Sequence, residues 1–289
     1  MNRKKFLQSG LLFPFINMDL HAFESEIIGS NESSDLMPVL FVGHGNPMNA
    51  IMPNAYSAKW KEIGEKIATP KAILCVSAHW QTRGTQVTFM EHPKTIHDFG
   101  GFPKALFDAQ YPAPGSPLFA QKTIDAVKAV HITKDLEWGL DHGCWSVLKP
   151  MFPKATIPVF QLSLDYLATP EQHFQIGMQL QSLRSKGVLI VGSGNLVHNL
   201  GMLNWEGGPF DWAIEFDALA KTKILEGDFV SLVGYRNLGK SAKLAIPTNE
   251  HYLPLLYALA LKTKNEPLHF FNESIDMGSI SMTSLFIGA

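Results

Sequence analysis

Short apolar runs that end in glycine-rich or polar turns recur along the chain. They lie at 38–42, 72–76, 157–164 and 188–191, and they are rich in Val, Ile, Leu and Phe with little alternation of polar residues. Unbroken apolar runs of this length are typical of strands that are covered on both faces, as in parallel sheets. The pattern therefore predicts four buried strands in one sheet.

Segments with helical spacing of apolar residues lie between and after these runs, at 117–130, 170–185 and 210–226. The alternation of strand-like and helix-like segments predicts an α/β fold with a mostly parallel central sheet covered by helices. No fixed-period repeat or low-complexity linker interrupts 37–289, so this stretch is expected to form a single domain.

A further helix is expected near the C-terminus. Thr248 is its predicted N-cap, Pro254 lies where proline is tolerated near a helix start, and 255–261 continues the apolar pattern. This interpretation places His251 in the first turn of the helix.

The first 36 residues differ from the rest of the chain. Basic residues at 3–5 followed by an apolar stretch at 10–18 resemble a twin-arginine export signal in which the second arginine is a lysine, although Pro14 interrupts the stretch. A loosely docked arm ahead of the fold is the favoured interpretation, and it predicts a cytoplasmic protein. The alternative is export to the periplasm.

Composition narrows the class of partner. The chain is 46% hydrophobic and 17% charged, which provides for a substantial core. Its 24 basic and 26 acidic residues give no electrostatic footprint of a protein that binds nucleic acid or an anionic membrane. No apolar run reaches the ~18 residues that a membrane span needs. We therefore expect a small-molecule partner, no nucleic acid and no membrane.

Histidines follow three of the predicted strands, namely His44, His79 and His198. Open α/β sheets bind ligands at the carboxyl ends of their strands, and imidazole is the commonest metal ligand among side chains. A mononuclear metal site is therefore predicted at these strand ends, with His44, His79 and His251 as ligands and His198 as a further candidate. For any one histidine a structural role is the alternative, which weakens when several occupy equivalent positions. Gly43 and Gly45 beside His44 would allow a close backbone approach or a positive φ.

A fifth histidine, His142, stands between Asp141 and Gly143. An acid beside a histidine suits acid/base chemistry, because a carboxylate can fix the imidazole tautomer. The alternative is a turn in which Asp141 caps the following helix. Cys144 is expected to pack rather than to act as a nucleophile, and its separation from Cys75 predicts no disulfide scaffold or zinc ribbon.

The segment 95–103 combines aromatic residues, glycines and the pair His97-Asp98. This composition suits a wall over an aromatic substrate, with His97 and Phe99 as the predicted substrate contacts, and an ordinary surface loop is the alternative. The glycine pair around Ser193 could cradle a phosphate, but no third glycine follows at the required spacing.

Five motifs occur in an order that resembles a known family. They are Gly-His-Gly-Asn-Pro at 43–47, Ser-Ala-His-Trp at 77–80, Asp-His-Gly at 141–143, Gly-Ser-Gly-Asn-Leu-Val-His-Asn at 192–199 and Glu-His at 250–251. Together they resemble the class III extradiol ring-cleavage dioxygenases, and among these the 4,5-DOPA extradiol branch, from about residue 37 to the C-terminus. The resemblance implies a single α/β domain that uses O2 to cleave a catechol such as 4,5-DOPA beside its hydroxyl pair.

The resemblance also implies roles for individual residues. His44 and His79 would be metal ligands, and His251 would supply a third ligand where better-known members have a carboxylate. His198 would be a fourth ligand or the base that deprotonates the catechol, and His142 would assist.

Two departures from the family pattern affect the site. Asn46 stands where serine is usual, and Glu250 adjoins His251, although consecutive helical positions cannot easily both face one metal. One divalent metal per chain is expected, Fe2+ or Zn2+, and the oxygen chemistry requires Fe2+ because Zn2+ has no accessible redox change. A histidine site also suits zinc, so the alternative is a zinc-dependent hydrolase or a non-catalytic metal-binding protein.

Overall fold

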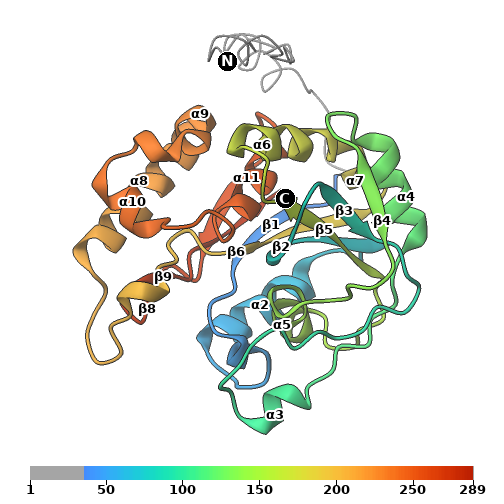
Figure 1. Cartoon of the computed structure of the whole chain (residues 1–289), viewed down its shortest axis with the longest axis horizontal. Helices are drawn as coiled ribbons and strands as arrows, with labels where there is room; N and C mark the ends of the chain where they lie inside the picture. The colour runs from blue at the N-terminus through green and yellow to red at the C-terminus, as the bar shows by residue number, and fades with distance from the viewer. Residues whose placement is uncertain (1–35, 289) are drawn as a thin grey trace, which may run out of the picture.

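Figure 1 shows the computed structural model, which describes residues 36–288; the arm or export signal predicted for 1–36 lies outside this range but for its last residue. The strands are β1 (Val39–Gly43), β2 (Ala72–Thr82), β3 (Thr85–Thr88), β4 (Ile132–Asp135), β5 (Val159–Asp165), β6 (Val188–Gly194), β7 (Leu268–Phe271), β8 (Ile275–Asp276), β9 (Ile280–Ser281) and β10 (Ser284–Ile287).

Eight of the strands form one sheet in the order β4-β3-β5-β2-β6-β1-β10-β7, while β8 and β9 pair with each other. The four central strands, β5, β2, β6 and β1, are parallel. Antiparallel pairs join β10 and β7 to one side and β3 to the other. The predicted mostly parallel sheet is confirmed, with antiparallel additions on both sides.

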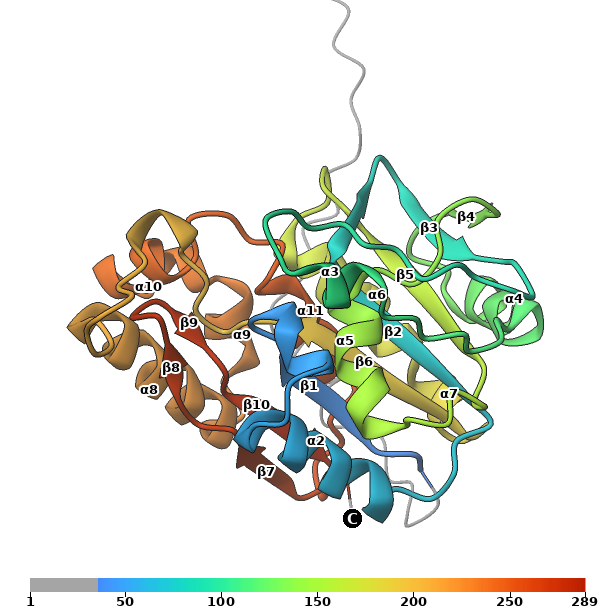
Figure 2. The same cartoon turned by 90° about the horizontal axis from the view of Figure 1, so that it is seen from below.

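The helices cover both faces of this sheet. They are α2 (Ala55–Lys66), α3 (Lys104–Phe107), α4 (Pro117–Ala126), α5 (His142–Met151), α6 (Pro170–Gln179), α7 (Gln181–Arg184), α8 (Asp211–Glu226), α9 (Phe229–Val233), α10 (Lys240–Ala245) and α11 (Leu253–Ala260), with short 3-10 turns η1 (Pro47–Ala50), η2 (Leu200–Met202) and η3 (Tyr235–Asn237). Helices α2 and α5 pack together on one face, and α6 and α11 pack together on the other (Figures 1 and 2). No helix among the described residues is both long and apolar enough to cross a membrane.

Two apolar cores, one on each face, explain why the strands are apolar throughout. Along β1, Val39 and Phe41 point into the core shared with α11, whereas Leu40 and Val42 point into the core shared with α5. Successive side chains of a strand alternate between faces, so a strand covered on both faces buries every position.

Strand β2 is longer than its apolar run predicts. The turn expected at 77–80 is wrong, because the strand continues to Thr82 and its register against β5 shifts between Val76 and Gln81. Such an irregularity lets a strand change its direction without ending. His79 therefore lies within the irregular part of β2.

The predicted cap of the last helix is also wrong. Helix α11 begins at Leu253 after Tyr252, whose side chain makes no capping hydrogen bond. The hydroxyl of Thr248 instead donates to Oε1 of Glu250 at 2.9 Å. His251 consequently lies in the turn that precedes the helix.

Candidate metal centre and active site

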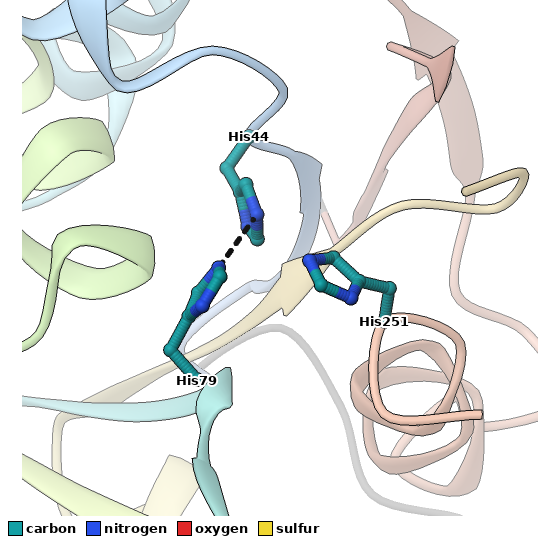
Figure 3. Close-up of side chains that lie close together, drawn as sticks. All are labelled: His44, His79 and His251. Carbon is teal, nitrogen blue, oxygen red and sulfur yellow. Dashed lines mark hydrogen bonds between the residues drawn. The ribbon is translucent and has the colours of Figure 1, made fainter. Parts of the chain in front are cut away.

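Three histidines from distant parts of the chain converge in one place (Figure 3). His44 follows β1, His79 lies in β2, and His251 precedes α11. One ring nitrogen from each lies within 4.8 Å of those of the other two, and the Nε2 atoms of His44 and His79 are 3.1 Å apart. Nitrogen ligands at ~2.0 Å from a tetrahedral zinc ion are about 3.3 Å apart. The His44–His79 distance matches this value, and the His251 nitrogen lies within 4.8 Å of both, so the three imidazoles are close enough to bind a single divalent ion.

Glycines allow this convergence. A Cβ atom on Gly194, at the end of β6, would lie 2.1 Å from the carbonyl oxygen of His251, so only glycine lets the turn before α11 approach the strand end. Gly45 has a φ of 55°, and a Cβ there would lie 2.4 Å from Sδ of Met282. Both explanations offered for the glycines beside His44, close approach and positive φ, apply at Gly45.

The hydroxyl of Ser193 is the partner of the Nδ1 atom of His44. This nitrogen lies 3.0 Å from the hydroxyl oxygen of Ser193, and that hydroxyl donates to the carbonyl of Gly143 at 2.5 Å. Since the hydroxyl hydrogen is already engaged, Nδ1 of His44 must donate, which leaves Nε2 free to face the other histidines. Ser193 lies inside the buried end of β6, where it holds a histidine rather than a phosphate.

Carboxylates lie near Nδ1 of the other two histidines. Oε1 of Glu250 lies 3.2 Å from Nδ1 of His251, and Oδ2 of Asp98 lies 3.7 Å from Nδ1 of His79. Carboxylate and hydroxyl partners on the outer nitrogen are typical of metal-binding histidines, because they fix the ring orientation and make the inner nitrogen more basic. The residues present fit a bound divalent metal.

Burial keeps these imidazoles neutral. It lowers the pKa of His44 and of His251 well below the usual range, and the charges of neighbouring histidines lower both further. Burial likewise lowers the pKa of His79 to about 3 and that of His198 to about 4, although nearby carboxylates partly oppose it. A neutral imidazole has the lone pair that a metal needs, so no proton has to leave at pH 7.

His198 lies beside the three converging histidines. Its ring stacks on that of His251, with centroids 3.5 Å apart and planes 9° apart. Ring nitrogens of His198 and His251 and a carboxylate oxygen of Glu250 also lie within 4.8 Å of one another. The structure therefore brings His198 to the same place as the three histidines, next to His251.

His142 is the first residue of α5, and Asp141 is the N-cap of this helix. The Asp141 carboxylate accepts from the amide of Cys144 at 3.0 Å, from Ser77 Oγ at 2.6 Å and from Gln161 Nε2 at 2.7 Å. The capping alternative is thus confirmed for Asp141. Burial raises the pKa of Asp141, which the hydrogen bonds from Ser77 and Gln161 oppose.

The carboxylate next to the His142 ring belongs to Asp98, whose Oδ2 lies 2.9 Å from Nδ1 of His142. The His142 ring also lies against His79, with centroids 3.8 Å apart. His142 is thus part of the same histidine cluster.

The two residues predicted to contact the substrate, His97 and Phe99, have different surroundings. The Phe99 ring stands edge-on to His142, with centroids 5.6 Å apart. His97 contacts the carbonyl of Ala109 through Nε2 at 2.8 Å and packs against Phe99 and Trp145. Phe99 therefore borders the histidine cluster, whereas the described contacts of His97 support the segment that carries Phe99.

Cys75 and Cys144 are both buried free thiols. Burial, followed by contact with Cys75, raises the pKa of Cys144 well above its usual value, which fits packing rather than nucleophilic chemistry.

Sequence reasoning missed Asp98 and Ser193 as partners of histidines. The signal for Asp98 was visible as the His97-Asp98 pair, but neighbouring side chains in an extended segment point in different directions, and the pair alone does not tell which of them faces the site. Nothing in the local pattern marks Ser193, whose partners, His44 and Gly143, lie far from it in sequence.

Comparisons with known proteins agree with this geometry. The family described as "Catalytic LigB subunit of aromatic ring-opening dioxygenase" matches residues 38–284. A 4,5-DOPA dioxygenase extradiol of Escherichia coli (strain K12) is 47% identical over 262 residues, which cover 89% of this chain and 96% of that protein. A 4,5-DOPA dioxygenase extradiol of Beta vulgaris is 36% identical over 264 residues, covering 89% of this chain and 98% of that protein.

A solved structure is also similar. The crystal structure of an uncharacterised protein from Escherichia coli K12 superposes with a TM-score of 0.77 at 42% identity, covering 87% of this chain and 100% of the other.

Proposed function

This chain belongs to the family of catalytic LigB subunits of aromatic ring-opening dioxygenases, and from that premise we propose that it is an extradiol dioxygenase for a catechol such as 4,5-DOPA. It is an enzyme that cleaves aromatic rings. In the proposed reaction the carbon–carbon bond beside the two hydroxyl groups breaks and both atoms of O2 enter the ring-opened product, so no further reductant is needed.

The convergence of His44, His79 and His251 carries the proposal. These residues would hold one divalent metal through their inner nitrogens. Bound Fe2+ would supply open positions for the catechol oxygens and O2 together with the redox change that the reaction needs. Zn2+ fits the same imidazoles but lacks the redox change, so Fe2+ is the proposed working metal.

Two histidines, His142 and His198, are proposed to take part in proton transfer. His142 lies against His79 and next to the carboxylate of Asp98, where it can take a proton from a catechol hydroxyl. A neutral imidazole suits this step because its unprotonated nitrogen can accept a proton. His198 is proposed as either a second base or a fourth metal ligand. A His198→Ala variant with lower metal affinity would identify a ligand, and one with normal affinity but a lower kcat would identify a base.

Phe99 is proposed to contact the substrate ring. Its own ring stands next to His142, and an aromatic side chain there would pack against the flat catechol and keep water away from it. His97 is proposed to act with Phe99 in this contact by supporting the segment through its bond to Ala109.

Oxygen uptake tests the proposal. Protein reconstituted with Fe2+ without air is mixed with DOPA in aerated buffer, and O2 consumption and the rise of a yellow product are followed. The same assay is run on zinc-loaded protein, on His44→Ala and on the matched control His92→Ala, because His92 is exposed and outside the cluster.

We expect uptake by the iron-loaded protein and by His92→Ala, and at least a 100-fold loss in His44→Ala and in the zinc-loaded sample. Stoichiometric metal binding without O2 uptake for any catechol tested would refute the proposal for those substrates. Turnover of esters or amides by the zinc form would then favour a hydrolase.

A further inference from the structure

Asp98 contacts His142 at two points. Its Oδ1 accepts from the backbone amide of His142 at 2.8 Å, and its Oδ2 lies 2.9 Å from Nδ1 of the same residue. The ring of His142 is not aligned for a regular hydrogen bond at Nδ1, which has no other described partner. Hydrogen bonds of catalytic groups are often poorly aligned before substrate binds and tighten in the complex.

The same carboxylate also lies near a candidate metal ligand. Oδ2 of Asp98 is 3.7 Å from Nδ1 of His79, while Nε2 of His79 faces His44. The same oxygen of Asp98 therefore lies at hydrogen-bond distance from His142 and within 4 Å of His79.

The contacts of Asp98 are those of a hydrogen-bond acceptor. Its Oδ1 accepts from the backbone amide of His142, and its Oδ2 faces Nδ1 of the same residue at 2.9 Å. An ionised carboxylate can only accept hydrogen bonds, so an imidazole nitrogen facing it is favoured to carry the hydrogen.

We propose that Asp98 is a positioning residue that keeps the hydrogen of His142 on Nδ1, leaves its Nε2 free to accept a proton from the substrate, and orients His79 toward the metal. The part that concerns the substrate proton rests on the function proposed above. Asp141, the acid next to His142 in sequence, does not serve in this way because its oxygens are engaged by the helix cap, Ser77 and Gln161.

A role as a metal ligand is the competing explanation for Asp98. Ligand atoms of His79, Asp98 and His142 do lie within 4.8 Å of one another. His79 would, however, have to bind two ions through its two nitrogens, whereas a carboxylate behind a ligating histidine is a common arrangement. We therefore assign Asp98 to orientation.

The test compares Asp98→Asn with wild type and with the matched control Asp108→Asn, an exposed residue that pairs with Lys104. Zinc affinity and stoichiometry are measured by calorimetry with a competing chelator. The tautomer of His142 in the zinc-loaded protein is measured by 15N NMR of the imidazole nitrogens. The kcat and KM of the iron-loaded protein are measured with DOPA.

In Asp98→Asn we expect zinc affinity to fall about 10- to 100-fold, a typical loss when an outer partner of a ligand is removed. The Nδ1–H form of His142 should no longer dominate, and kcat should fall by about 100-fold or more while KM changes much less. Asp98→Glu, which keeps the charge, should restore part of the Nδ1–H signal. This second variant keeps the proposal testable if Asp98→Asn does not fold. Asp108→Asn should match wild type throughout.

Wild-type zinc affinity together with a wild-type His142 tautomer in Asp98→Asn would overturn the proposal. A second bound zinc in wild type that disappears in Asp98→Asn would also overturn it, because Asp98 would then be a ligand. If wild type shows no catechol turnover, the proposed function fails on its own, and the zinc and NMR measurements still decide the role of Asp98.

Discussion

At the scale of single residues, His173 is a histidine whose place is structural. It is fully buried in α6, where Nδ1 contacts the hydroxyl of Tyr257 at 2.9 Å and Nε2 contacts the carbonyl of Asp165 at 3.2 Å. A carbonyl only accepts, so Nε2 carries the hydrogen and Nδ1 accepts from the tyrosine. Burial lowers the pKa of His173 to about 4.

This lowered pKa predicts a loss of stability in mild acid. The unfolded chain binds a proton at His173 below pH ~6.5, whereas the folded chain does not until about pH 4, so the free energy of unfolding falls as pH drops through this window. Between pH 7.5 and 5 the loss should be about 2 kcal/mol. Urea unfolding of metal-loaded wild type and His173→Gln at pH 7.5 and 5 checks this. The variant should be the less stable protein at pH 7.5 and the less sensitive to pH; equal sensitivity would contradict the assignment.

The sequence identified His44, His79, His142, His198 and His251 because each stands in a recognisable local pattern, and the structure brings all five together. Their partners were harder to find. Ser193 and Asp98 reach histidines that lie far away along the chain, and such contacts depend on tertiary packing that no local pattern encodes.

At the scale of elements, the junction of β6 with α11 brings His251 into the site. The amide of Asn195 donates to the carbonyl of His251 at 2.9 Å, directly beside Gly194. We expect Gly194→Ala to push this turn away, since its Cβ would lie 2.1 Å from that carbonyl. The control is Gly208→Ala, where an added Cβ meets nothing within 4 Å.

Calorimetric zinc titration and thermal unfolding should show at least a tenfold loss of affinity and a lower Tm for Gly194→Ala, with Gly208→Ala near wild type. An unchanged affinity in Gly194→Ala would mean that the turn can move without disturbing His251.

The central strands were predictable because burial on both faces imposes an apolar residue at every position. Two element boundaries were not. Strand β2 passes through its polar residues because β5 continues to pair with it beyond the irregularity. Helix α11 begins later than a cap at Thr248 would predict. The Thr248 hydroxyl donates to the Glu250 side chain instead of capping the helix, and backbone contacts with the end of β6 hold the turn before the helix.

At the scale of the whole molecule, the candidate ligands join the two ends of the described domain. His44 follows the first strand, and His251 lies near the last helix. A metal that binds only the folded chain stabilises it by mass action, by about 2.7 kcal/mol at a free concentration 100 times the Kd. Removing the metal with a chelator should therefore lower Tm by several degrees, and readdition should restore it. The same treatment of His44→Ala should change Tm little; an equal shift in that variant would place the stabilising ion elsewhere.

The order of the strands has a consequence for association between chains. The outermost strands, β4 and β7, are only four residues long, and β4 carries Lys134 and Asp135. Short edge strands offer few unpaired backbone groups on which another chain could add a strand, and the charged residues of β4 disfavour such pairing further. The most apolar segments, β1, β2 and β6, lie inside the sheet with both neighbours already paired. The strands most prone to aggregation are thus the ones that the fold makes least available.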